Sequence, residues 1–253
     1  LAALLGRATG AEASFLARLV GGELRQGASE GVMLDAVAVA AEVPAALVRR
    51  AAMLGGRIDE VAELAMRGGA ATLSEVGLQL GRPLQPMLAS TAPSVTDAVG
   101  ALGSASVEWK LDGIRVQVHR RGDRVQIWTR NLNDITDRLP GVVAAARTLD
   151  AHDAVLDGEA IGLGADGRPR LFQDNVSVGE GALRPFFFDL LHVDGEDLLD
   201  RPLVERRERL HRVAGAWVVP SHLTDDATEG EQVLTDSLAA GHEGVVVKSA
   251  TSA

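Results

Sequence analysis

The stretch VEWKLDGIRVQVHRRGDRVQIWTRN, residues 107–131, decides the fold of this chain. Apolar and polar residues alternate through most of it, which is the two-residue period of strands with one buried face. Asp112-Gly113 and the segment RRGDR at 120–124 interrupt the alternation, and both are typical of hairpin turns. The stretch therefore predicts antiparallel strands over 106–110, 114–120 and 125–130.

Lys110 stands in an unusual place, at the end of the first predicted strand. Strand alternation puts Glu108 and Lys110 on one face and Val107 and Trp109 on the other. Beyond the Asp-Gly turn Arg115 also lies on the polar side, so one side of the predicted hairpin is apolar and the other carries the charged side chains. Two interpretations of the lysine stay open here: a solvated side chain at a strand end, or an amine that loses its proton and attacks an electrophile.

Residues 1–81 carry a helical pattern instead. Their apolar residues recur at helical spacing, and glycine pairs such as Gly21-Gly22 close the segments. The first apolar stripe comprises Phe15, Leu16, Leu19 and Val20, and the second comprises Val32, Leu34, Val37 and Val39. Pro83, Pro86 and Pro93 then favour an extended connector, because proline disfavours helix in the residue before it. The pattern predicts a small helical domain over 1–81.

The period changes to two near residue 104, which indicates a second domain over 82–253. Further strands are expected at 154–161, 185–190 and 244–248, and helices at 140–149, 202–213 and 229–240. Antiparallel strands mixed with helices define an α+β fold. The run of three valines at 245–247 predicts a strand buried on both faces, with Glu243 and Lys248 at its ends.

Composition restricts the classes of protein that this chain can be. A length of 253 residues with 46% hydrophobic content permits a substantial core. No apolar run approaches the roughly 20 residues of a membrane-spanning helix, so no membrane partner is expected. The absence of cysteine excludes disulfides and fits a reducing compartment, so we expect a cytoplasmic protein. The net charge of −10 disfavours nucleic acid as a partner unless the positive side chains gather on one surface.

Each charged motif, taken singly, has a structural explanation. Asp112-Gly113 is an ordinary hairpin turn, Glu159 can be a solvated strand residue, and Lys248 can guard a strand end against aggregation. The cluster His119, Arg120, Arg121 and Arg124 is equally well explained as a DNA-facing turn or as a polar hairpin tip. Arg25 is open in the same way, as a contact to DNA or as a helix cap.

The order of the segments is more specific than any one of them. The segments are EWKLDGIR (108–115), TRN (129–131), LDGEAI (156–161), FFFDLLHVDGEDLL (186–199) and HEGVVVKS (242–249). In sequence and succession they resemble the nucleotidyltransferase motifs of ATP-dependent DNA ligases. Residues 15–41, with the connector GRPLQPMLA (81–89), resemble the back half of that family's DNA-binding domain and its junction with the adenylation domain. The resemblance implies a partial helical DNA-binding domain over 1–81, followed over 82–253 by a mixed, largely antiparallel nucleotidyltransferase domain of ATP-grasp-like type.

The resemblance also implies a reaction. By motif position Lys110 attacks the α-phosphate of ATP, pyrophosphate leaves, and a covalent lysyl–AMP forms. AMP then passes to the 5′-phosphate of nicked double-stranded DNA, and the 3′-hydroxyl displaces it, as in replication, repair or recombination. Lysine suits the first step because its neutral amine is nucleophilic, and neighbouring cations or desolvation lower a lysine pKa from about 10.4. Mg²⁺ is the expected metal cofactor, because it offsets phosphate charge.

The remaining roles follow from motif positions. Glu108 matches the contact to the adenine amino group, and Phe188 matches the aromatic ring that stacks on adenine, with Phe186 and Phe187 as competitors. Arg115 and Arg130 match arginines that hold the ribose or the phosphates, where a forked guanidinium is effective. The last set comprises Glu159 as a ribose or metal ligand, Glu243 as a metal ligand and Lys248 as the cation beside the α-phosphate.

Three departures from the family pattern are visible. The chain stops at Ala253, before the further lysine-bearing strand and the OB-fold that follow in the family, so the adenylation domain is expected to be truncated and its ligation weak. The segment from Gln173 to Phe186 is shorter than the family pattern, and the helical domain matches only in part. Two alternatives accompany the expected monomeric ligase: an RNA ligase or capping-type nucleotidyltransferase, and a non-catalytic DNA-binding module with a ligase-like fold.

Overall fold

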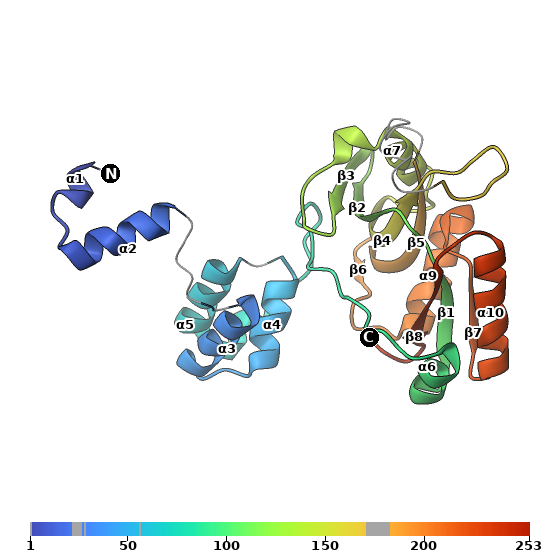
Figure 1. The fold of residues 1–253 in the computed structure, drawn as a ribbon, viewed down its shortest axis with the longest axis horizontal. Helices are drawn as coiled ribbons and strands as arrows, with labels where there is room; N and C mark the ends of the chain where they lie inside the picture. The colour runs from blue at the N-terminus through green and yellow to red at the C-terminus, as the bar shows by residue number, and fades with distance from the viewer. Residues whose placement is uncertain (1, 22–26, 28, 56, 171–182) are drawn as a thin grey trace. The chain divides into compact units, whose positions relative to one another are not determined.

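The computed structural model describes residues 2–21, 27, 29–55, 57–170 and 183–253 (Figure 1). The chain divides into two compact units, Leu1–Ala52 with Gly56–Glu75, and Met53–Gly55 with Val76–Ala253. The division at Glu75 lies shortly before the boundary expected at 81 and 82. Across the described residues, each helix is too short or too polar to cross a membrane.

The first unit is helical. Its helices are α1 (Ala2–Leu5), α2 (Gly10–Val20), α3 (Glu30–Ala40), α4 (Ala45–Met53) and α5 (Ile58–Ser74). The hydroxyl of Thr9 caps α2 while the Glu12 carboxylate accepts from the backbone of Thr9, and Gly21 ends the helix as the sequence predicted. Gly69, with φ of 62°, interrupts α5, so the glycine pair at 68–69 breaks the helical path without ending it.

The predicted apolar stripes of this unit were wrong in which residues they bury. Phe15 and Leu19 on α2 are 49% and 48% exposed. On α3 the buried residues are Leu34 and Ala38, while Val39 is 79% exposed. Leu34 and Ala38 are four residues apart and therefore lie on one helix face. Buried alanines contribute to the packing of this unit, and a search for large apolar residues overlooks them: Ala38, Ala51, Ala52 and Ala65.

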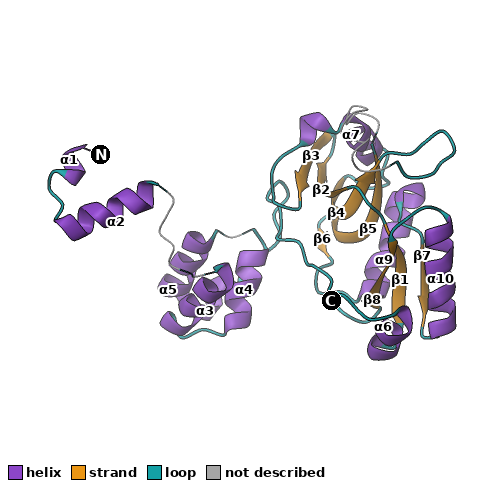
Figure 2. Ribbon diagram, viewed as in Figure 1, coloured by secondary structure: helices purple, strands orange, loops and turns teal. Residues whose placement is uncertain are grey.

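The second unit contains two antiparallel sheets (Figure 2). One has the strand order β7-β1-β8, and the other has the order β3-β2-β4-β5-β6. The strands are β1 (Ala105–Lys110), β2 (Ile114–Arg121), β3 (Arg124–Thr129), β4 (Asp153–Ile161), β5 (Arg184–Val193), β6 (Glu196–Asp197), β7 (Ser221–Thr224) and β8 (Gly244–Ser249). The six predicted strands are confirmed within one residue at their ends, except that β5 continues three residues further, to Val193. Strands β6 and β7 were not predicted, because they are short.

The predicted hairpin across Asp112-Gly113 was wrong. β1 pairs with β7 and β8, whereas β2 pairs with β3 and β4, so the Asp-Gly segment carries the chain from one sheet to the other. Gly113 is required by a close approach: a Cβ there would lie 2.3 Å from the carbonyl oxygen of Ala160. The hairpin that does form joins β2 to β3 through the RRGDR segment.

Helices cover both sheets. α6 (Val95–Leu102) and α10 (Ala227–Ala239) pack on the three-stranded sheet in a cluster that includes Val99, Val107 and Val247. α7 (Pro140–Arg147) and α9 (Leu203–Ala214) pack on the five-stranded sheet; a short 3-10 turn, Thr136–Arg138, precedes α7, and another, Gly215–Trp217, follows α9. Figure 1 shows α9 between β5 and β1. The three predicted helices correspond to α7, α9 and α10, whereas α6, which follows the predicted connector, was not predicted.

The strand of three valines, β8, is an edge strand with half-buried side chains, so the prediction that it is buried on both faces was wrong. A valine run indicates only that both faces of a strand are partly covered. On β8 one face packs with α6 and α10, and the strand has one neighbour, β1. Lys248, near the end of this strand, is consequently able to lie at the margin of the core.

His119 fastens the connector to the five-stranded sheet. Its ring is 3% exposed, Nδ1 accepts from the backbone N–H of Gly81 at 3.0 Å, and the side chain of Gln117 lies 3.0 Å from Nε2. Gln117 in turn bonds both backbone groups of Leu84. Burial, with the nearby charge of His192, lowers the pKa of His119 to about 3. This histidine is therefore neutral and structural, and the DNA-facing interpretation of the hairpin tip does not extend to it.

Replacing His119 with glutamine is expected to reduce the loss of folding stability that occurs as the pH falls below 6.5. A histidine pKa of about 3 in the folded state, below its usual 6.5, means that the unfolded chain binds the proton more readily. Stability is full above pH 6.5 and is lost as the pH falls, by about 2–3 kcal/mol between pH 6.5 and 4.5. Urea unfolding at several pH values measures it. Glutamine keeps a hydrogen-bond acceptor and a donor at this position. If His119→Gln loses as much stability at acid pH as the wild type does, this account is contradicted.

Candidate active site

The charged motif residues lie where the two sheets face each other. Lys110 ends β1, and its Nζ pairs with the Glu243 carboxylate just before β8. The backbone N–H of Glu243 also donates to the carbonyl oxygen of Lys110 at 3.2 Å. The lysine side chain is 50% exposed, so it is reachable from solvent. An ammonium group in such an ion pair has no free electron pair, so it would have to lose a proton before it could act as a nucleophile.

Glu108, two residues before Lys110, is the most buried charge of the site, with 2% exposure. One carboxylate oxygen accepts from Arg207 Nη1 at 2.7 Å and from the hydroxyl of Ser106 at 3.0 Å. The other oxygen lies 2.7 Å from Lys248 Nζ. Arg207 also donates to the hydroxyl of Ser221 on β7. Charge-assisted hydrogen bonds from both sides therefore fix this carboxylate.

Phe188 on β5 faces the same cations. Lys248 Nζ lies 4.3 Å and the Arg115 guanidinium carbon 5.5 Å from its ring centroid, within the range of cation–π attraction. These contacts join β8 of one sheet to β5 and β2 of the other. A ring that already attracts planar and cationic groups offers a stacking surface for a purine.

Arg115 makes a two-pronged ion pair with Asp157 on β4. Its Nε and Nη2 donate to the two carboxylate oxygens at 3.1 and 2.7 Å, and its Nη1 donates to the carbonyl oxygen of Met87. Burial raises the pKa of Asp157, against the opposing effect of Arg115. Because β2 and β4 are paired, Arg115 stands opposite Glu159. Arg130 follows β3 and lines a small hollow that Arg115 and Asp157 also line.

Glu159 differs from the other carboxylates of the site. Burial raises its pKa to about 7, although Arg115 and a backbone hydrogen bond from Gly113 favour the ionised form. Near neutral pH this group therefore exists in both protonation states. A buried carboxylate whose pKa is shifted in this way, among other charged residues, is typical of functional sites.

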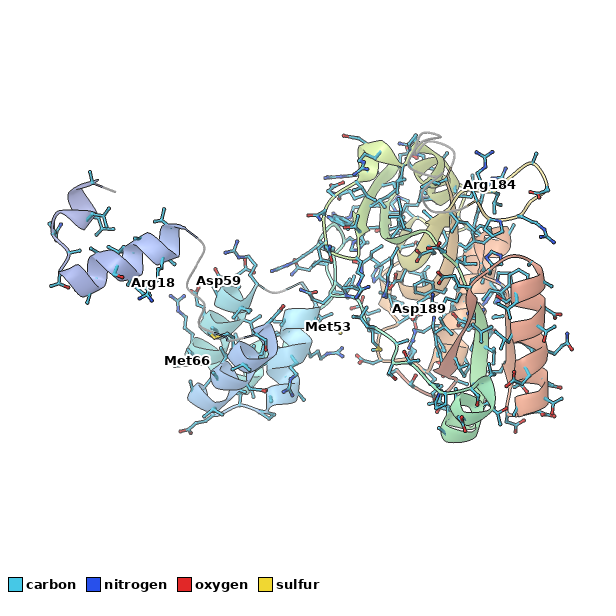
Figure 3. The ribbon with its side chains drawn as sticks, viewed as in Figure 1. Arg18, Met53, Asp59, Met66, Arg184 and Asp189 are labelled. Carbon is cyan, nitrogen blue, oxygen red and sulfur yellow. The ribbon has the colours of Figure 1, made fainter. Side chains whose placement is uncertain are left out.

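The sequence overlooked three charged residues that position the site. Asp157 and Asp189, the latter labelled in Figure 3, hold Arg115 and Arg206, and Arg207 holds Glu108. A signal existed for Arg207, because it lies four residues after Leu203 and three before Leu210, on the buried stripe of α9. Arg120 turns inward as well and donates to Ala146 and Leu149 carbonyl oxygens. Arg25 and most of the segment from Gln173 to Phe186 lie outside the described residues.

Lysine is rare in this chain. It contains two lysines, Lys110 and Lys248, and uses arginine at every other cationic position apart from histidine. Both lysines lie in the site just described, one paired with Glu243 and the other with Glu108. A compact ammonium on a flexible stem can lose a proton and can move, whereas a guanidinium remains charged. This distribution is consistent with lysine where a cation must move or lose a proton, and arginine where a permanent charge is needed.

The carboxylates of the site can supply part of the ligand set that Mg²⁺ requires. Within the described parts of the chain, no three His, Asp or Glu side chains gather closely enough to hold a metal ion on their own. Glu159 and Glu243 nevertheless offer the hard carboxylate oxygens that Mg²⁺ takes, and nucleotide sites commonly leave its other positions to water and phosphate. The residues present therefore fit a metal that arrives with a nucleotide triphosphate.

Comparison with known proteins gives a consistent answer. Residues 86–253 match the family described as "ATP dependent DNA ligase domain". The chain is 52% identical over 259 residues to "Probable DNA ligase" of Saccharopolyspora erythraea, and 51% identical over 258 residues to a protein of that name from Pseudarthrobacter chlorophenolicus. Each alignment covers 100% of this chain and 51% of the relative.

Solved structures of DNA ligases are also similar to this chain. The crystal structure of the ligase domain from M. tuberculosis LigD shares 30% identity, with a TM-score of 0.55 over 66% of this chain and 55% of that one. A mycobacterial DNA ligase D complexed with ATP and MES shares 31% identity, with a TM-score of 0.55 over 66% of this chain and 54% of that one. The α+β fold of the second unit is that of a ligase domain. The chain belongs to the ATP-dependent DNA ligase family, and it spans about half the length of the curated relatives it matches.

Proposed function

We propose that this chain carries out the adenylation chemistry of an ATP-dependent DNA ligase, with Lys110 as the residue that becomes bonded to AMP. The observation that carries the proposal is the position of Lys110: it ends β1, pairs with Glu243, and lies in the same site as Phe188, Lys248 and Arg115. The structure of the related ligase D with ATP supports ATP as the nucleotide.

The proposed reaction has three steps. Neutral Nζ of Lys110 forms a bond to the α-phosphorus and releases one proton to solvent, the bond from that phosphorus to the oxygen bridging to the β-phosphate breaks, and pyrophosphate leaves with that electron pair. The 5′-phosphate of a DNA nick then takes AMP from the lysine, and the 3′-hydroxyl displaces AMP to form the phosphodiester. Mg²⁺, held by Glu159 and Glu243 when bound, would neutralise phosphate charge.

The other side chains bind and orient. Phe188 stacks on adenine, Glu108 accepts from the adenine amino group, and Lys248 donates to the α-phosphate. Arg115 and Arg130 hold the ribose or phosphates, each with the geometric control of a forked donor. The first 81 residues are the proposed helical contribution to nicked double-stranded DNA binding, in a monomeric enzyme.

The test uses the longest natural form of the protein that carries these residues. It is incubated with Mg²⁺ and ATP labelled at the α-phosphate, with unlabelled ATP or GTP as competitor, and then given a nicked duplex. We expect covalent label, competition by ATP, and sealing of the nick. Competition by GTP instead, or sealing of RNA alone, would indicate a capping-type enzyme or an RNA ligase. Absence of any covalent label would contradict the proposal in favour of a non-catalytic module.

A further inference from the structure

Two cations of the site share one carboxylate. Lys110 has Glu243, Arg115 has Asp157, and Arg206 has Asp189. Arg207 and Lys248 instead share the single carboxylate of Glu108. Glu159, the other carboxylate nearby, interacts with Arg115. The other three cations each have a carboxylate of their own, whereas Arg207 and Lys248 compete for Glu108.

The two cations on Glu108 are not equivalent. Arg207 is 9% exposed, spans Glu108 and Ser221, and is fixed on α9, whereas Lys248 is 25% exposed and sits at the margin of the core. The rigid guanidinium is suited to a permanent contact, and the flexible lysine is suited to leaving. Lys248 also lies over the Phe188 ring, on which adenine would stack.

We propose that Arg207 is a positioning residue that keeps Lys248 free to leave Glu108 when a nucleotide binds. This inference rests on the proposed function of the site. While Arg207 holds Glu108, the departure of Lys248 leaves that buried carboxylate paired and hydrogen-bonded. The incoming base stacks on the ring of Phe188, and the α-phosphate becomes the new anionic partner of Lys248. Binding of the base is thereby coupled to the movement of Lys248 from Glu108 to the α-phosphate.

Without Arg207, Lys248 becomes the sole charged partner of Glu108. Its departure would then leave a buried carboxylate without a counter-ion, which strongly opposes the movement. In Arg207→Met, which keeps a long apolar side chain, we expect the rate of AMP transfer to Lys110 at saturating ATP to fall about 100-fold, the effect of losing one well-placed donor at a reacting phosphate.

Removing the charge of Glu108 should release the lysine again. Glu108→Gln keeps an acceptor oxygen for the adenine amino group but no longer holds an ammonium ion strongly. The double variant Arg207→Met with Glu108→Gln is therefore expected to react on the order of tenfold faster than Arg207→Met alone, with Glu108→Gln as the reference. A residue that only stabilises the fold predicts a double variant as slow as, or slower than, the single one.

A second measurement reads the movement of Lys248 without any chemistry. Because the chain has two lysines, ¹³C-lysine labelling gives two sets of side-chain NMR signals, and the ring of Phe188 shifts those of Lys248. Addition of α,β-methylene-ATP, which cannot expel pyrophosphate, should remove that shift in the wild type but leave it in Arg207→Met. An equal loss in both proteins, or a double variant no faster than Arg207→Met, would overturn the inference. A wild type that shows the shift change but never acquires AMP would contradict the proposed function and leave this inference standing.

Discussion

Lys110→Ala is expected to abolish nick sealing with ATP while leaving the last step of the reaction intact. The variant has no amine to accept AMP, so the loss should reach the limit of detection. A nicked duplex that already carries AMP on its 5′-phosphate bypasses the lysine, and the variant should still seal it. Labelled duplexes of both kinds, resolved on a denaturing gel, give the measurement.

Lys248→Ala provides the matched control, because it removes the only other lysine of the chain. It should retain slow covalent labelling, since Lys248 assists the α-phosphate but is not bonded to it. Labelling that persists in Lys110→Ala and disappears in Lys248→Ala would show that the two lysines have been assigned the wrong way round.

Arg115→Met is expected to cost about 3–5 kcal/mol of stability, the usual effect of removing one partner of a buried ion pair. The reason is Asp157, whose side chain is 11% exposed and would be left without its two charge-assisted hydrogen bonds. Thermal or urea unfolding measures the loss. Because burial already raises the pKa of Asp157, the loss should shrink as the pH falls and that carboxyl takes up a proton.

Adding Asp157→Asn separates stability from function. The double variant no longer buries an unpaired charge, so much of the stability should return. Covalent labelling should not return, because the arginine that holds the nucleotide is still missing. A double variant as unstable as Arg115→Met would show that the arginine stabilises the fold by some other contact, such as its bond to Met87.

Most of the candidate site could be predicted from the sequence because its residues lie on or next to strands. The position of Lys110 at a strand end, the valine run before Lys248 and the phenylalanines of β5 all follow from short-range pattern, and the order of the motifs supplied the family. The two-residue period also placed six of the strands. These features depend on residues a few positions apart, which a single sequence displays directly.

The features that the sequence missed depend on distant partners. Asp112-Gly113 fits a hairpin turn and a crossing between sheets equally well, and the deciding contact is Ala160 on another strand. Arg207 and Glu108 are 99 positions apart, and no local signal joins them. α6 could have been found, because Ser94 caps it and Asp97 occupies its first turn, but the neighbouring prolines suggested an extended connector.

The central claim is that one amine of this protein becomes bonded to the phosphorus of AMP. Intact mass spectrometry after exposure to ATP and Mg²⁺, followed by peptide mapping, tests it most directly. The account predicts a gain of one adenylyl group, lost on treatment with acid and carried by the peptide that contains Lys110. An unchanged mass, or the adenylyl group on the peptide of Lys248, would contradict it.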